Sequence, residues 1–189
     1  MWLMMWAIWK FRLRGSRTMD KGSTLDFFAR IYRRMYEDEE LMRLLTYDPM
    51  GYRDGKYYKD PLDGTLPNIV DQDSDTYWEL VDERVVLGEK SSDLETKAIC
   101  RVYVYEGRIR EVFGNYHFLT QEVNVDIFIH EKFDKDLRLS RIKDRVAELI
   151  ALERLAGYNR LDYKAGNPRE APTHYRRFLH QYEMLVKKK

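Results

Sequence analysis

Apolar residues repeat on one helical face between Ser23 and Leu45. The stripe consists of Leu25, Phe28, Ile31, Tyr32, Met35, Leu41, Leu44 and Leu45, and this spacing predicts an amphipathic helix. Ser23 or Thr24 can cap its N-terminus, with Asp26 in a capping-box position. We expect a break near the acidic run 37–40, because such a run is typical of a solvated face or of a second helix N-terminus.

Proline and glycine interrupt every regular pattern between Tyr47 and about Asp75. The interruptions are Pro49, Gly51, Gly55, Pro61, Gly64 and Pro67. The aspartates of this segment lack the spacing of a calcium loop. A loop of this length is usually either functional or disordered, and tyrosine is rare in disordered linkers. Because four tyrosines fall between 47 and 58, we expect an ordered loop near 47–75 that contacts a partner.

Two stretches alternate between apolar and other residues, which predicts β-strands. In the first, the alternating positions are Cys100, Val102 and Val104 against Arg101, Tyr103 and Tyr105. Glu106-Gly107 is expected to turn the chain into a second short strand. In the second stretch, they are Val123, Val125, Ile127 and Ile129 against Asn124, Asp126, Phe128 and His130. Such a strand has one face in a core and the other in water or in an interface.

Helical spacing returns from Asp136 to Leu155. The expected core positions are Leu139, Ile142, Val146, Leu149 and Ile150, and the polar side carries Arg138, Arg141, Lys143, Asp144, Arg145 and Glu148. Gly157 is placed to end this helix. The C-terminal stretch YRRFLHQYEMLVKKK fits either a strand or a helix, and the alternation of Phe178, His180 and Tyr182 favours a strand. Together these elements predict an α+β fold, an antiparallel or mixed β-sheet with helices packed on one face.

Composition narrows the class of protein. The 189 residues contain 33 Lys and Arg against 32 Asp and Glu, so no overall polybasic character argues for nucleic-acid binding. The length fits a single domain over 23–189 preceded by an extension, 1–22. The single cysteine, Cys100, excludes an internal disulfide and a cysteine-rich zinc site, and its apolar neighbours place it in the core. The 14 tyrosines favour an assembly component, because tyrosine is enriched at interfaces.

The first eighteen residues, MWLMMWAIWKFRLRGSRT, combine three tryptophans with a basic flank. The apolar run is shorter than the roughly 20 residues that span a bilayer, and its charges follow the apolar run, the reverse of a secretory signal. It can be an interfacial membrane segment, an arm that buries Trp2, Trp6 and Trp9 in a partner, or an optional extension before Met19. We favour the arm or the extension, with no stable membrane insertion.

Common catalytic and metal-binding motifs do not occur in the sequence. His117, His130, His174 and His180 form no H-x-x-x-H or H-E-x-x-H pair, and phosphate-loop, dinucleotide and serine-hydrolase motifs are missing. Asp126 with Glu131 and Lys132 is faintly similar to the acidic elements of metal-dependent nucleases. Because neighbouring residues of a strand point to opposite sides, a nuclease is kept only as an alternative. We expect no enzyme activity, cofactor or metal.

The order of these elements resembles the tail terminator and tail-to-head joining (neck) proteins of tailed bacteriophages. The resemblance is carried by FFARIYRRMYEDEELMRLLTY, by VDIFIH leading into RIKDRVAELI, and by APTHYRRFLHQYEML. Together these motifs cover most of the chain from Thr24 to Leu185. The first eighteen residues and the loop 47–75 are longer than the plain pattern of such proteins.

The resemblance implies a structural protein of the virion tail or neck, assembled in the host cytoplasm. It implies a ring, commonly a hexamer, that caps the tail tube protein and meets a head-completion or connector protein. DNA would pass through the lumen without sequence-specific binding.

A ring subunit needs complementary surfaces for its neighbours. We expect these contacts to come from Trp2, Trp6, Trp9, Tyr52, Tyr57, Tyr58, Tyr103, Tyr105 and Phe128. The alternative is that the sheet aromatics are covered by the chain's own loops. A peripheral membrane protein bound through residues 1–18 is a further alternative.

Overall fold

The structure is a computed structural model that describes residues 24–89, 92–151 and 161–187. The predicted partner arm 1–22 with its three tryptophans, the capping residue Ser23 and the helix-ending Gly157 all lie outside the described residues.

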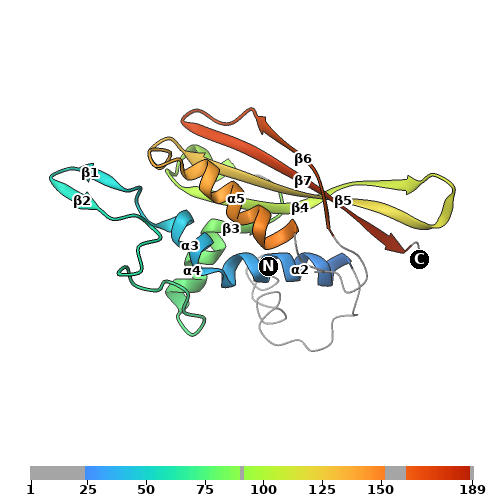
Figure 1. The fold of residues 1–189 in the computed structure, drawn as a ribbon, viewed down its shortest axis with the longest axis horizontal. Helices are drawn as coiled ribbons and strands as arrows, with labels where there is room; N and C mark the ends of the chain where they lie inside the picture. Colours follow the sequence, from blue (N-terminus) through green and yellow to red (C-terminus); the bar gives the residue numbers. More distant parts are fainter. Residues whose placement is uncertain (1–23, 90–91, 152–160, 188–189) are drawn as a thin grey trace.

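A five-stranded mixed sheet forms the centre of the fold (Figure 1), in the order β3-β4-β5-β7-β6. Its strands are β3 (Val85–Leu87), β4 (Cys100–Val112), β5 (Asn115–His130), β6 (Asp162–Arg169) and β7 (Tyr175–Lys187). Only β3 and β4 run parallel; the other neighbours are antiparallel. A register shift between Tyr163 and Ala165 interrupts the outer strand β6. The C-terminal stretch is therefore a strand, as the alternation of its residues predicts.

Four helices cover one face of this sheet (Figure 1): α2 (Thr24–Glu37), α3 (Glu39–Thr46), α4 (Asp75–Arg84) and α5 (Arg138–Ala151). The predicted α+β class, with a mixed sheet and helices packed on one face, is confirmed. The register places Val102 opposite Ile127 and Ile127 opposite Phe178, so the alternating apolar residues of three strands share the helix-facing side. Burial of each such aliphatic or aromatic side chain stabilises the fold by about 1.5–3 kcal/mol.

The predicted break in the first helix lies at Asp38. Its carboxylate accepts a hydrogen bond from the Leu41 amide at 2.7 Å and so caps α3. The same carboxylate pairs with Arg145 of α5 at 2.6 and 3.0 Å. The acidic run is therefore a second helix N-terminus, where negative charge is favourable, and it also joins the α2–α3 corner to α5.

The predicted turn at Glu106-Gly107 is wrong, because β4 continues to Val112 and the chain reverses at Phe113-Gly114 instead. The register between β4 and β5 shifts between Glu106 and Ile109, where β4 carries a bulge. An added Cβ on Gly107 would lie 2.8 Å from the side chains of Asn124 and Glu122. This glycine therefore allows two side chains to cross the strand closely, which is a different use of glycine from a turn.

Arg138 is also not where the helical pattern predicts it. The pattern puts it on the polar side of α5, yet the side chain is fully buried. Its guanidinium donates to the carbonyl oxygens of Leu44 and Tyr47 and pairs with the Asp136 carboxylate at 3.0 Å. The last turn of α3 leaves carbonyl groups without helical partners, and Arg138 satisfies them from the start of α5.

Candidate functional site

The β4–β5 hairpin extends beyond the helix layer at one end of the molecule (Figure 1). We call residues 107–121 the distal arm. Ile109 is 58% exposed, and Phe113 at the tip is fully exposed. Phe118 of β5 and Leu185 of the neighbouring strand β7 are exposed as well. So many exposed large apolar side chains on one hairpin are unusual on a protein surface and typical of a contact site.

The distal arm is basic as well as apolar. Arg108 and Arg110 are exposed on β4, and Glu111 is the single acidic residue of the arm, with the exposed Glu106 directly before the arm. Arg110 is half-exposed and lies 3.6 Å from the buried carboxylate of Glu122, which offsets part of its charge. Within residues 107–121 the arginines exceed the carboxylates by one, so the arm has a small positive excess beside its apolar residues.

A second, smaller hairpin projects from the other end of the molecule (Figure 1). Its strands are β1 (Gly51–Arg53) and β2 (Lys56–Tyr58), and we call it the tyrosine hairpin. Tyr52 and Tyr57 are 74% and 60% exposed, which leaves both free for the partner contacts expected from the sequence. Tyr58 is half-buried, with the Arg53 guanidinium 4.6 Å from the centre of its ring.

Arginine side chains fasten the segment that carries the tyrosine hairpin. Arg43 of α3 donates to the carbonyl oxygens of Asp63 and Leu66, each at 2.9 Å, and to Pro67 at 3.3 Å. Arg141 of α5 binds the Asp60 carboxylate at 2.6 Å, and the hydrogen bond from Arg141 lowers the pKa of Asp60. These bonds satisfy backbone groups that a long loop would otherwise leave to water, so the loop 47–75 has a defined conformation.

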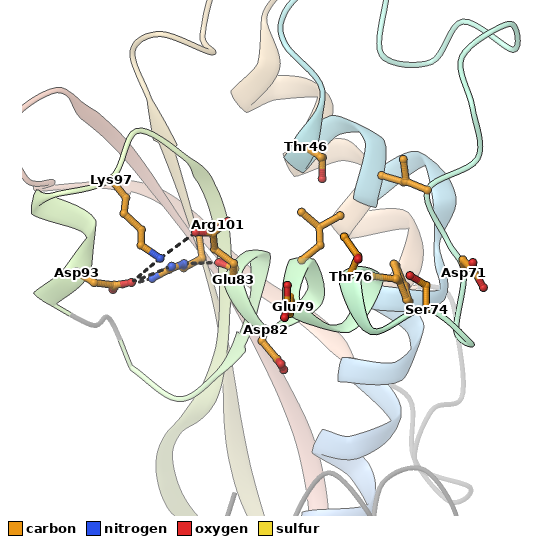
Figure 2. A pocket seen from close by; sticks show the side chains of 13 residues that line it. Thr46, Asp71, Ser74, Thr76, Glu79, Asp82, Glu83, Asp93, Lys97 and Arg101 are labelled. Atoms are coloured by element: carbon orange, nitrogen blue, oxygen red, sulfur yellow. Dashed lines mark hydrogen bonds and ion pairs between the residues drawn. The ribbon is translucent and has the colours of Figure 1, made fainter. Parts of the chain in front are cut away.

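A groove runs along α4, from the loop that carries Ile69 and Asp71 to the short 3₁₀ helix η1 (Ser92–Glu95) (Figure 2). It encloses about 1040 Å³. Its apolar lining consists of Ile69, Tyr77 and Leu80, and its carboxylates are Asp71, Glu79, Asp82, Glu83 and Asp93. Lys97 and Arg101 supply the cationic groups of the lining. Five carboxylates against two cations give the groove a negative rim.

One wall of the groove is fixed by ion pairs (Figure 2). Arg101 binds both oxygens of Asp93, at 2.8 and 3.0 Å, and donates to the Glu83 carbonyl at 2.6 Å. Lys97 binds the Glu83 carboxylate at 2.8 Å, and this hydrogen bond lowers the pKa of Glu83. The bidentate arginine pair is the strong form of such contacts. The wall is thus a preformed feature, and both cations of the lining are engaged in it.

Two predicted partner residues are buried in the chain itself. Tyr103 and Phe128 have no exposed surface and pack in a second apolar cluster, with Leu94, Ile99 and Tyr175, on the sheet face away from the helices. The segment before β4 folds over this face, so the expectation that these two residues contact a partner is corrected. The alternative, that the chain's own loops cover them, holds. Tyr105 is half-buried at the border of this cluster.

The residues of the nuclease alternative do not meet. The Asp126 carboxylate is buried and accepts hydrogen bonds from Nε and Nη2 of Arg177, while Glu131 pairs with His174 at 2.8 Å in a turn. Within 24–89, 92–151 and 161–187, no group of three or more His, Cys, Asp or Glu residues is placed to hold a metal ion. In that same part of the chain no helix is long and apolar enough to cross a membrane.

The sequence placed His180 in a strand but did not predict that its ring is buried. It lies on the helix-facing side of β7, 4% exposed, among the rings of Phe178, Tyr163 and Tyr182. Among the residues that the structure describes, neither ring nitrogen has a hydrogen-bond partner, and the hydroxyl of Tyr182 also lacks one. Burial, together with the nearby charge of Lys143, lowers the pKa of His180 to about 4. This histidine is therefore kept neutral in the folded chain at ordinary pH.

The sequence profile of one protein family matches residues 38–184, from the cap of α3 through the tyrosine hairpin, the groove and the distal arm to β7. The chain belongs to the YomW family. This YomW-family membership associates the chain with phage regions, in agreement with the phage origin that the order of elements implies. No curated protein gives a significant match.

Proposed function

We propose that this YomW-family chain is a structural virion protein, a ring-forming tail terminator or neck subunit. In this role it caps the tail tube and joins it to the head connector, and DNA passes through the ring. The observation that carries the proposal is the pair of unlike hairpins with exposed aromatics at opposite ends of the molecule. The phage association of the family supports the same setting.

A subunit with different contact surfaces at its two ends associates head to tail, and such contacts close into a ring when the rotation per subunit is right. The exposed aromatic residues Tyr52, Tyr57 and Phe113 are the type that anchors protein interfaces. A catalytic step or a cofactor has no part in this role.

The proposal is tested by native mass spectrometry and negative-stain imaging of the purified chain, alone and mixed with tail tubes. Rings of uniform size, alone or at tube ends, are the expected result. The double variant Tyr52→Ser/Tyr57→Ser should lose contacts with ring or tube and keep its thermal unfolding curve, since both side chains are exposed.

Leu137→Asn is the matched control. Leu137 is 75% exposed and has a positive φ of 58°, a conformation that asparagine tolerates. A chain that stays monomeric in solution and never binds tubes contradicts the proposal.

A further inference from the structure

We infer that the distal arm of one subunit docks in the groove beside α4 of a second copy of this chain. This inference rests on the proposed function and names the contact that closes the ring. It gives the groove one occupant, the β4–β5 hairpin with Phe113 at its tip.

The opposite net charges of the arm and of the groove lining favour this occupant. The arm carries Arg108 and Arg110 with a single carboxylate, Glu111, whereas the groove is lined by five carboxylates and two cations. Both of those cations are bound to Glu83 or Asp93 in the wall, so the lining keeps an excess of three carboxylates, while on the arm Arg110 is shared with Glu122. A positive arm in a negative groove gains attraction on approach and fixes the orientation of the two subunits.

The apolar parts of the two surfaces also match. Phe113 is fully exposed at the tip of the arm, and the groove offers the partly buried Ile69 and Leu80 beside the buried ring of Tyr77. An aromatic side chain that fills a pocket with a polar rim is the usual centre of an interface. The Tyr77 hydroxyl is already bound to the Tyr36 carbonyl, so this ring is held in place as part of the lining.

The placement of the two surfaces requires a second molecule. The arm extends from one end of the molecule and α4 lies toward the other end (Figure 1), so the arm cannot enter its own groove. Because the two surfaces are different, each copy can donate one arm and accept another, which is the head-to-tail contact of a ring.

One variant alters the arm and a second variant alters the groove. Phe113→Ser, combined with Arg108→Glu, alters only exposed residues of the arm, and Asp71→Lys/Glu79→Lys reverses charges at the exposed rim of the groove. Each variant alone should weaken subunit association by roughly 30-fold or more, the loss expected for an interface hot spot. Arg169→Glu, an exposed charge reversal on β6, is the matched control and should assemble like the unaltered chain.

Mixing the two defective variants gives the sharpest result. Each retains one intact half, so an equimolar mixture should form one-to-one dimers and no larger rings in native mass spectrometry. Association should also weaken as salt rises, because the screening length falls from about 10 Å at 0.1 M to about 3 Å at 1 M ionic strength.

The outcomes separate this inference from the proposed function. Rings that persist unchanged in either variant overturn the arm-in-groove contact and leave the ring itself standing. Loss of rings only on deletion of residues 1–18 identifies the N-terminal segment as the occupant and also overturns the inference. An unaltered chain that forms no ring alone or on tail tubes contradicts the proposed function itself.

Discussion

The neutral, buried His180 should make the fold sensitive to mild acid. Its pKa is lowered from 6.5 to about 4, first by burial and then by the nearby Lys143, while Asp144 opposes the shift. Above pH 6.5 the folded and unfolded chains both hold a neutral imidazole. As the pH falls, the unfolded chain takes up the proton first, so the free energy of unfolding decreases until the folded chain is protonated as well.

The size of this loss follows from the shift in pKa. A difference of about 2.5 pKa units corresponds to about 3 kcal/mol at 1.36 kcal/mol per unit. Roughly 2.5 kcal/mol of it should be lost between pH 7 and pH 4.5. For a chain of this length the corresponding change in melting temperature is about 5–10 °C.

The perturbation is His180→Phe, which keeps a ring among Phe178, Tyr163 and Tyr182 and removes the titrating group. Urea unfolding of the variant and of the unaltered chain, followed by circular dichroism at pH 7 and pH 4.5, measures the loss for each. The variant should lose about 2.5 kcal/mol less than the unaltered chain. The matched control, His117→Gln, changes an exposed histidine and should lose as much as the unaltered chain. If His180→Phe and the unaltered chain lose equal stability between pH 7 and pH 4.5, His180 is not the source of the acid sensitivity.

Three further predictions concern single buried features. Arg138→Met removes the closest cation from the buried Asp136 carboxylate and the donor of two carbonyl groups and should lower the free energy of unfolding by about 3–5 kcal/mol. Arg141→Met should cost less, because Arg141 is partly exposed and lies 3.7 Å from Asp136; equal losses in urea titrations would contradict this. Gly107→Ala should cost about 1–3 kcal/mol through overpacking, against nearly no change for Gly64→Ala, which has open space around it. Burial raises the pKa of the single thiol, Cys100, to about 12, so it should react with a disulfide reagent only at the rate at which the chain unfolds; rapid labelling in native buffer would show otherwise.

Sequence periodicity predicted the faces of the sheet because it depends on local geometry. The alternation in β5 and β7 follows directly from the two-residue repeat of a strand, and the α2–α3 break follows from the capping chemistry of Asp38. The burial of residues that contact distant segments of the chain was not predicted from periodicity. Arg138 is buried only because the end of α3 lies beside the start of α5, and Tyr103 only because η1 folds over it.

The candidate assembly surfaces were only partly visible in the sequence. Tyr52 and Tyr57 were named from composition, and the structure leaves them exposed. Phe113 was not predicted as a contact residue, because an aromatic residue after an alternating strand is typical of a core position. The length of the β4–β5 hairpin places it at the tip instead. The groove joins a loop, α4 and a segment after β3, so no local pattern could have revealed it.

Both outer strands of the sheet are poor templates for another strand. β3 has only three residues, and β6 carries Pro168 without an amide donor, the exposed Lys164, and the register shift after Tyr163. Short strands, proline, lysine and bulges at an edge all prevent sheets from joining. At high concentration, copies of this chain are thereby protected from fusing into continuous cross-β fibres, and any contact between copies is left to side-chain surfaces rather than to strand pairing.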